Sequence, residues 1–321
     1  MRQSNRYRGG VLLILAASIL WGTTGTAATF APEVSPIAIG AAAMGFGGLL
    51  QALIALRSIR VNCHSLREQW RILALGAIAV TVYPLAFYSS MSLAGVAVGT
   101  VVSIGSAPVF ASIIERVADQ YRFTRRWAAG AVLGIGGATV LSISEFVTPA
   151  ATGDFDAQLG IGLGLLAGFT YALYSWAAHR VISAGVPTRP AMGSIFGVAG
   201  VLLMPIVLAS GAPLLASWSN ASVGIYMAVV PMFAGYVLFG MGLARVRAST
   251  AIILSLVEPI VAALLAVVIV GEQLPTLGWV GVGLIASSLM VLTIQSPLRD
   301  GRIIGSNRND DLQIKDLLGG P

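Results

Sequence analysis

Apolar runs of about 20 residues alternate with short polar segments along the chain as far as residue 296. A helix of about 20 residues crosses the hydrocarbon core of a bilayer, which is about 30 Å thick. The pattern predicts ten membrane-spanning helices, at approximately 10–30, 36–56, 71–93, 97–116, 127–144, 160–179, 191–210, 223–243, 248–270 and 277–294. We therefore expect an all-α polytopic membrane protein, followed by a polar cytoplasmic tail over residues 297–321.

Composition supports this interpretation. Hydrophobic residues make up 56% of the chain and charged residues only 10%, whereas soluble domains carry about 25% charged residues. These values exclude a disordered chain and a soluble nucleic-acid-binding protein. The single cysteine, Cys63, excludes a scaffold held together by intrachain disulfides.

The charges are distributed on one side of the predicted topology. All 19 lysines and arginines lie in alternate segments: the N-terminus, the loops after the second, fourth, sixth and eighth spans, and the tail. The opposite loops contain acids but no bases: Glu33, Glu145, Asp154, Asp156 and Glu272. Basic loops stay on the cytoplasmic side of a membrane, so we expect both termini in the cytoplasm.

The two halves of the chain resemble each other. A shift of 151 residues pairs Pro108 with Pro259, and the same shift pairs Pro36 with Pro187. We expect one five-span repeat in residues 1–149 and a second in residues 150–296. An odd number of spans forces the second repeat to enter the membrane from the opposite side, so the repeats are inverted. This architecture is typical of secondary transporters that work by alternating access around a central cavity.

Two prolines occupy equivalent places in the repeats. Pro108 and Pro259 each lie about 11 residues, or roughly 17 Å, into their span. A proline at this depth removes a backbone hydrogen bond, so we expect both residues to break or kink their helices and to take part in gating. The alternative is a kink that serves packing alone.

Glu258 is the one acidic residue that the predicted boundaries place deep inside a span. A carboxyl group in the membrane is costly unless it faces a cavity or a partner. We expect it to receive a proton or the ammonium group of a substrate. The alternative is a residue that only hydrogen-bonds to backbone freed at the neighbouring proline.

Aromatic and hydroxyl side chains within the spans are candidates for the cavity lining. The candidates are Trp21, Tyr83, Phe87, Ser103, Ser106, Tyr171, Tyr174, Ser175 and Tyr236. Together they predict an apolar, aromatic and lightly polar cavity for an amphiphilic small solute. The alternatives are ordinary helix packing for the aromatic rings and bonds to the same helix for the serines.

The sequence lacks the motifs of several other functional classes. It has no P-loop and no HExxH zinc motif, and its two histidines, His64 and His179, lie beside arginines rather than inside apolar runs, where a Ser-His or Cys-His enzyme of the membrane would need one. We therefore expect no enzyme activity, no metal and no cofactor. The expected partners are a small-molecule substrate and membrane lipid, without nucleic acid. The oligomeric state stays open, and a monomer is consistent with the sequence.

Several of these residues also carry a family resemblance. Leu20-Trp21-Gly22, the Pro108 segment, Val257-Glu258-Pro259, Gly271-Glu272 and Trp279 resemble the drug/metabolite transporter superfamily and its ten-span EamA-type members. The resemblance implies spans 1–4 and 6–9 around a central cavity, with spans 5 and 10 to the side. Unlike the small four-span drug exporters of the superfamily, this chain has no acid in span 1, so their proton-linked mechanism does not carry over.

Within the family the chain looks like the YddG-type exporters of aromatic and other amino acids. That likeness implies export of amino acids across the bacterial inner membrane. Two alternatives stay open: another metabolite or drug class carried by the same fold, and a lipid flippase or scramblase.

Overall fold

The computed structural model describes residues 2–145, 154–271 and 273–293. The predicted tail and Glu272 lie outside these residues. All of the regular structure in the described part is helical, and ten of its helices are long and apolar enough to cross a membrane. The predicted fold class and the ten spans are therefore confirmed.

Among the described residues, seven spans are single helices, and three consist of more than one helical segment. The first span comprises α1 (Arg2–Gly22) and α2 (Thr24–Ala28). The unbroken spans are α3 (Pro36–Val61), α5 (Trp70–Ala94), α6 (Val96–Ala118), α7 (Arg125–Glu145), α8 (Asp154–Ser183), α9 (Thr188–Ser210) and α14 (Thr276–Thr293). The eighth span comprises α10 (Trp218–Met227), the π-helix η2 (Ala228–Gly235) and α11 (Tyr236–Leu243), and the ninth comprises α12 (Ala248–Leu254), α13 (Val257–Leu265) and the π-helix η3 (Ala266–Val270). Two short elements lie between spans, α4 (Cys63–Glu68) and the 3-10 turn η1 (Ala212–Leu215).

The third and fourth spans are separated by one residue. Gly95 adopts a φ of 87° between the end of α5 and the start of α6. This backbone conformation is unstrained only for glycine. The turn at Gly95 therefore explains how two apolar runs that nearly touch in the sequence become two antiparallel spans.

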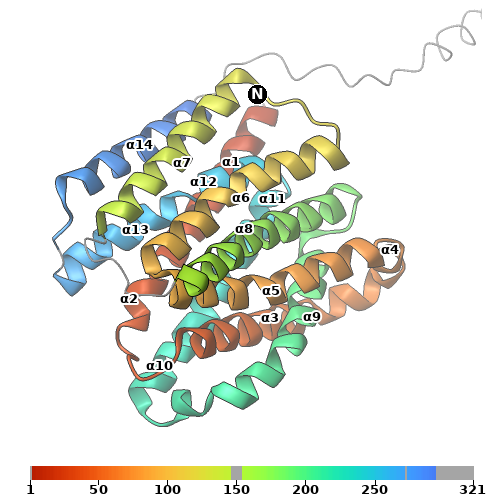
Figure 1. Cartoon of the computed structure of the whole chain (residues 1–321). Helices are drawn as coiled ribbons and strands as arrows, with labels where there is room; N and C mark the ends of the chain where they lie inside the picture. Colours follow the sequence, from red (N-terminus) through yellow and green to blue (C-terminus); the bar gives the residue numbers. More distant parts are fainter. Residues whose placement is uncertain (1, 146–153, 272, 294–321) are drawn as a thin grey trace, which may run out of the picture.

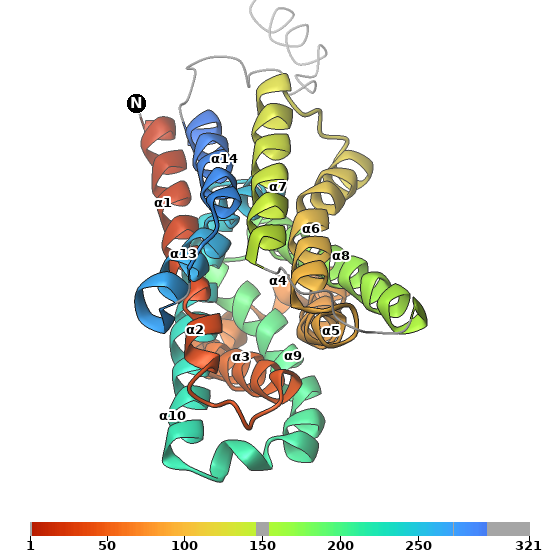
Figure 2. The same cartoon turned by 60° about the vertical axis from the view of Figure 1, so that its left-hand side comes forward.

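Helices of one half pack against helices of the other. The helix pairs α3 and α9, α5 and α8, and α7 and α14 pack against each other extensively. The α7–α14 pair lies to one side of the bundle (Figures 1 and 2). Gly137 and Gly281 let that pair approach closely, because a Cβ at either position would lie within 2.8 Å of the other helix's backbone. This arrangement agrees with the placement of spans 5 and 10 that the resemblance implied.

The outward faces of the spans are apolar. Leu12, Val132, Leu208 and Val268 are each at least 66% exposed. In water such a surface would drive aggregation, whereas lipid chains solvate it without cost. The exposed side chains thus support the membrane interpretation independently of helix length.

The two symmetric prolines occupy different local structures: the helix is broken next to Pro259 but not at Pro108. Pro108 lies inside the unbroken helix α6. Pro259 lies just after a break at residues 255–256, where hydrogen bonds shorten to a three-residue spacing, from Leu256 N to Ile253 O and from Glu258 N to Ser255 O. The missing N–H of Pro108 removes one backbone hydrogen bond and leaves the flanking turns of α6 intact. Next to Pro259 the regular i to i−4 backbone hydrogen bonds of the ninth span are lost as well.

Candidate functional site

A cavity lies at the centre of the bundle, between the first, second, third, sixth, eighth and ninth spans. Its volume is about 60 Å³, which is room for several water molecules, since one requires about 10–15 Å³. The lining residues are Trp21, Thr24, Gly40, Met44, Tyr83, Pro84, Phe87, Tyr88, Tyr171, Tyr174, Met232, Tyr236 and Glu258. Most of the lining is aromatic, with one carboxyl group and no basic side chain.

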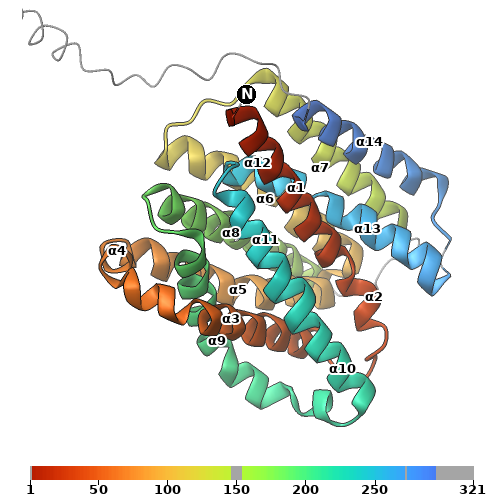
Figure 3. The ribbon, with the colours of Figure 1, turned by 180° about the vertical axis from the view of Figure 1, so that it is seen from behind.

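Most of the residues singled out in the sequence meet at this cavity. Trp21, Tyr83, Phe87, Tyr171, Tyr174, Tyr236 and Glu258 all line it. They come from five spans, and α1, which carries Trp21, runs beside α11, which begins at Tyr236 (Figure 3).

The three candidate serines lie outside this lining. Ser103 and Ser175 are buried, and Ser106 donates to the Ser103 carbonyl of its own helix. A Cβ at Gly168 would come within 2.1 Å of Ser106 Oγ and 2.6 Å of Ser103 O. That face of α6 therefore packs directly on α8, which removes these serines from the solute space.

Other lining residues were missed because they are small or lie beside stronger candidates. Gly40 makes room for the ring of Tyr88, since a Cβ at Gly40 would lie 2.1 Å from Tyr88 Cε2. Thr24, Met44 and Met232 carry no pattern that separates them from core residues. Only the cross-packing of α3 and α5 brings Gly40 and Tyr88 together.

The aromatic rings form a continuous wall. Tyr83 contacts Phe87 with ring centroids 5.8 Å apart, and it contacts Tyr171 at 5.5 Å. Trp21 packs on Tyr236 at 4.8 Å. These separations fall in the range that aromatic pairs prefer, so the wall is well packed and offers ring faces and edges to a solute.

The wall ends in a plug toward the bundle end that carries the basic loops. Tyr174 and Tyr236 share a hydrogen bond of 3.0 Å between their hydroxyl groups. Phe196 packs against both rings, and Phe239 is fully buried next to Tyr236. A solute in the cavity therefore meets closely packed rings in that direction.

Glu258 sits in the first turn of α13, immediately after the break in the ninth span. Its side chain forms no hydrogen bond or ion pair with the residues that the structure describes. The backbone around it is held close to α1, because a Cβ at Gly22 would lie 2.8 Å from Glu258 O and 2.6 Å from Val261 Cβ. The Leu20-Trp21-Gly22 motif thus brings the first span against the acid-bearing turn.

The hydroxyl groups of the cavity divide into paired and free ones. Tyr171 Oη bonds to Ser255 Oγ at 2.7 Å, and Ser255 Oγ also donates to Ile252 O beside the helix break. The hydroxyls of Tyr83 and Tyr88 form no hydrogen bond within the described residues. The free polar groups of the lining are therefore one carboxyl and two phenol hydroxyls.

A π-helix places another polar contact next to the cavity. The Trp21 Nε1–H donates to Pro231 O at 3.0 Å, within η2 of the eighth span. π-helical segments leave carbonyls out of the regular ladder and are frequent at functional sites. The tryptophan ring is therefore held by an irregular backbone segment that the pattern of apolar residues in the sequence did not predict.

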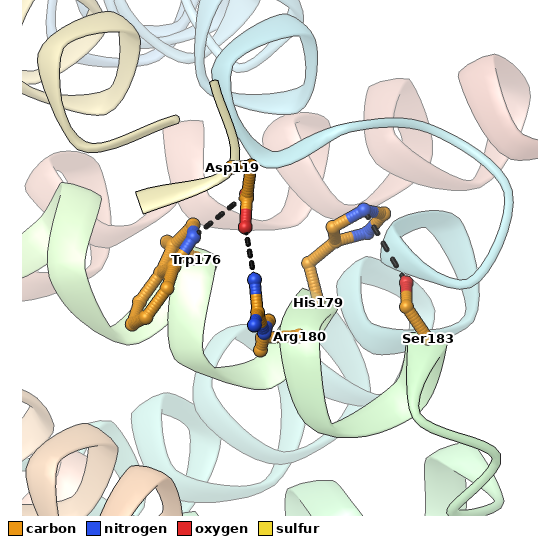
Figure 4. Close-up of polar contacts among 5 residues, drawn as sticks. All are labelled: Asp119, Trp176, His179, Arg180 and Ser183. Atoms are coloured by element: carbon orange, nitrogen blue, oxygen red, sulfur yellow. Dashed lines mark hydrogen bonds and ion pairs between the residues drawn. The ribbon is translucent and has the colours of Figure 1, made fainter. Parts of the chain in front are cut away.

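Polar contacts join helices of different repeats at the bundle end that carries the basic loops. Glu115, fully buried near the end of α6, accepts hydrogen bonds from Ser249 N at 3.1 Å and Ser249 Oγ at 2.7 Å. Asp119, just beyond α6, pairs with Arg180 and accepts a 2.9 Å bond from Trp176 Nε1 (Figure 4). These contacts join the first repeat to the second.

Glu115 is a second buried acid within the described spans, near the end of α6 rather than deep inside it. The predicted boundary at residue 116 puts Glu115 at the edge of the fourth span, and it was not singled out from the sequence. Both acids lie within spans in the structure, but Glu115 has two donors from one partner, and Glu258 has none among the described residues. Of the two, Glu258 is the acid open to a ligand.

The described residues contain no group of three or more histidine, cysteine, aspartate or glutamate side chains placed to hold a metal ion. The cavity instead offers rings, hydroxyls and a carboxylate, which bind an organic solute by stacking, hydrogen bonding and charge. Nothing in the lining provides a nucleophile paired with a base.

The chain matches the EamA-like transporter family twice, over residues 8–143 and 158–294. It is 30% identical over 283 residues to the "Uncharacterized transporter YwfM" of Bacillus subtilis (strain 168), with 88% of this chain and 93% of the relative covered. It is also 23% identical over 304 residues to the "Uncharacterized inner membrane transporter YicL" of Salmonella typhimurium, with 91% and 97% covered.

A solved crystal structure has the same fold. It superposes with a TM-score of 0.72 at 20% identity and covers 88% of this chain and 95% of its own. The chain belongs to the EamA-like transporter family and is a multi-pass membrane transporter rather than an enzyme. The two matched segments are the two repeats. None of these relatives has a substrate in its name, so the likeness to YddG-type exporters carries no support from them.

Proposed function

We propose that this transporter exports amino acids, with a preference for aromatic and other amphiphilic ones, across the bacterial inner membrane by alternating access. The proposal rests chiefly on one observation: an aromatic cavity contains a single carboxylate without a protein partner and no basic side chain. A carboxylate in this position favours an ammonium group, and the surrounding rings favour an apolar or aromatic side chain. Amino acids combine both features.

The free hydroxyls complete the proposed binding mode. Tyr83 and Tyr88 donate to the carboxylate of the amino acid, while Glu258 accepts from its ammonium group. An incoming side chain stacks against the wall formed by Phe87, Tyr83 and Tyr171. Binding of both ends of a zwitterion would discriminate against sugars, which offer no charge, and against hydrophobic cations, which lack the carboxylate.

The closed end supports alternating access. In this conformation the basic end is sealed by the aromatic plug and by the Glu115–Ser249 contact. To release or receive a solute there, these contacts must separate. Inverted repeats provide a second conformation of similar energy in which the two halves exchange shapes. The break in the ninth span is the natural hinge, since it lies between Ser249 and Glu258.

Reconstitution tests the proposal. Purified protein in liposomes is loaded with labelled amino acids, a sugar and a hydrophobic cation in separate preparations, and efflux is followed at two external pH values. A fluorescent phospholipid in the same vesicles reports lipid exchange. We expect efflux of aromatic amino acids without lipid exchange. Failure of every amino acid to leave the vesicles refutes the proposal, and lipid exchange alone would establish a scramblase.

A further inference from the structure

A second crevice lies at the basic end of the bundle, away from the central cavity. It is between the start of α1 and the turn that joins α11 to α12, and its volume is about 380 Å³. The lining residues are Arg6, Tyr7, His179, Ala244, Arg245, Val246 and Arg247. Three arginines and a histidine thus line one crevice, with no acid among the lining residues.

The crevice is formed by close packing of two segments that are far apart in the chain. A Cβ at Gly10 would lie 2.7 Å from Arg245 Cβ and 2.8 Å from Val246 Cγ2, and one at Gly9 would lie 3.2 Å from Arg245 Nη1. The first turns of α1 therefore rest directly on the α11–α12 turn. Such contact fixes the walls of the crevice and brings the guanidinium group of Arg245 beside the α1 backbone.

Neighbouring groups hold other parts of the wall in place. The Arg247 guanidinium lies over the ring of Tyr121, 3.7 Å from its centroid. His179 Nδ1 is 2.7 Å from Leu243 O, so this nitrogen is the donor and the ring is oriented by the backbone (Figure 4 shows its position beside Arg180). The cationic wall thus has a defined geometry.

The arginines of this crevice differ from others at the basic end in their lack of partners among the described residues. Arg180 pairs with Asp119, and Arg189 donates to Ile54 O at 2.7 Å. Within the described residues, the guanidinium groups of Arg6 and Arg245 form neither an ion pair nor a hydrogen bond. Like charges gathered around one crevice repel each other, and a bound anion would relieve that repulsion.

We propose that this crevice binds a phosphate group, either the headgroup phosphate of an anionic lipid or free phosphate. The planar guanidinium group presents paired N–H donors that match two phosphate oxygens, and here such groups approach from two segments. Basic pockets between spans on the cytoplasmic side are suited to anionic headgroups. The proposal is independent of what the central cavity carries.

Occupancy has a structural consequence. A phosphate held by Arg6 and Arg245 bridges α1 to the α11–α12 turn, a few residues before Ser249. That turn leads into the contact with Glu115 that closes this end of the bundle. A bound phosphate therefore stabilises the closed end, and its loss favours opening.

The test measures binding to the full-length protein in a zwitterionic detergent at constant ionic strength. Separate titrations use a short-chain phosphatidylglycerol, a short-chain phosphatidylcholine and inorganic phosphate, and the thermal midpoint and native mass spectra report binding. The variant is Arg6→Gln with Arg245→Gln. A matched control, Arg57→Gln with Arg60→Gln, removes the same charge from exposed positions on α3.

We expect the crevice variant to bind the anionic ligand, phosphatidylglycerol or inorganic phosphate, about tenfold more weakly or worse, while the control stays within about twofold of the parent protein. A response to phosphatidylglycerol alone identifies the lipid as the source, and a response to inorganic phosphate as well identifies the free anion. Equal losses in both double variants, equal binding of phosphatidylcholine, or no binding at all would overturn the proposal. If the double variant does not fold, Arg6→Gln alone, which alters an exposed side chain, gives the same comparison.

Discussion

Removing the hydroxyl of Ser249 should open the basic end of the transporter. Ser249 is completely buried and donates to both carboxylate oxygens of Glu115, from its hydroxyl at 2.7 Å and from its backbone nitrogen at 3.1 Å. In Ser249→Ala one of these oxygens loses its donor while staying buried. The side chain shrinks by a single atom, so packing changes little.

The magnitude follows from the charge on the acceptor. A hydrogen bond to a charged group contributes about 1.5–3 kcal/mol net. Because the contact joins the two repeats, it exists only while this end is closed. With 1.4 kcal/mol for each factor of ten, the ratio of closed to open protein should fall about 10- to 150-fold.

Cysteine labelling can measure this shift. The single native thiol is removed by Cys63→Ser, and Leu243→Cys introduces a reporter at a position that is fully buried at the basic end. Membranes that expose this end are treated with a maleimide that does not cross bilayers. We expect Ser249→Ala to raise the labelling rate at least about tenfold.

Ser112→Ala is the matched control, because Ser112 lies on the same helix as Glu115 and bonds only to Val109 O of that helix. The control should label at the rate of the reporter protein alone. If Ser249→Ala and Ser112→Ala label equally slowly, the Glu115–Ser249 contact does not hold this end closed, and the reasoning is refuted.

Two further substitutions test how the cavity is built. Gly22→Ala places a methyl group 2.6 Å from Val261 Cβ, and it should destabilise the fold by about 1–3 kcal/mol and slow transport. The control is Gly25→Ala, whose methyl group meets nothing within 4 Å. Equal thermal midpoints for the two variants would contradict the close approach of α1 and α13. Trp21→Phe keeps a ring but leaves Pro231 O without its 3.0 Å donor, so the thermal midpoint in detergent should fall by an amount corresponding to about 1–3 kcal/mol, and an unchanged midpoint would exclude a structural role for the bond.

The spans were predictable because hydropathy and charge report the membrane directly. The boundary at Gly95 illustrates this: two apolar runs separated by one turn residue were recognised as two spans from the alternation of basic loops. The starts of α3 and α9 follow from Pro36 and Pro187, which lie where helices begin. These features are local in the sequence and depend little on tertiary packing.

Irregular backbone was less predictable. Pro108 and Pro259 look equivalent in the sequence, yet only the ninth span breaks. The difference lies in the surroundings of Leu256 and Glu258, where α1 packs through Gly22 and Ser255 bonds to Tyr171. Such contacts join residues far apart in the chain, so the prolines alone could not predict which of the two helices breaks.

The site was predictable in its residue types and only partly in its members. A tyrosine hydroxyl deep inside a span needs a hydrogen-bonding partner, which a wet cavity supplies, so the convergence of the deep tyrosines on a cavity could be expected. Serines give no such signal, because a hydroxyl fits equally well between two helices, as Ser103 does. Glu115 was missed since its partner, Ser249, is 134 residues away and its own position is near a helix end.

The central claim is that Glu258 binds the ammonium group of an aromatic solute, and competition for transport tests it most directly. Efflux of a labelled aromatic amino acid is measured against the corresponding amine, which lacks the carboxylate, and the corresponding acid, which lacks the ammonium group. Glu258→Gln is compared with Glu33→Gln, which alters an exposed acid outside the cavity.

We predict that the amine competes in the parent protein and in Glu33→Gln and that the acid does not. Glu258→Gln should lose competition by the amine and most of the efflux, and its remaining efflux should no longer depend on pH through this carboxyl. Unchanged efflux and unchanged competition in Glu258→Gln would contradict the account.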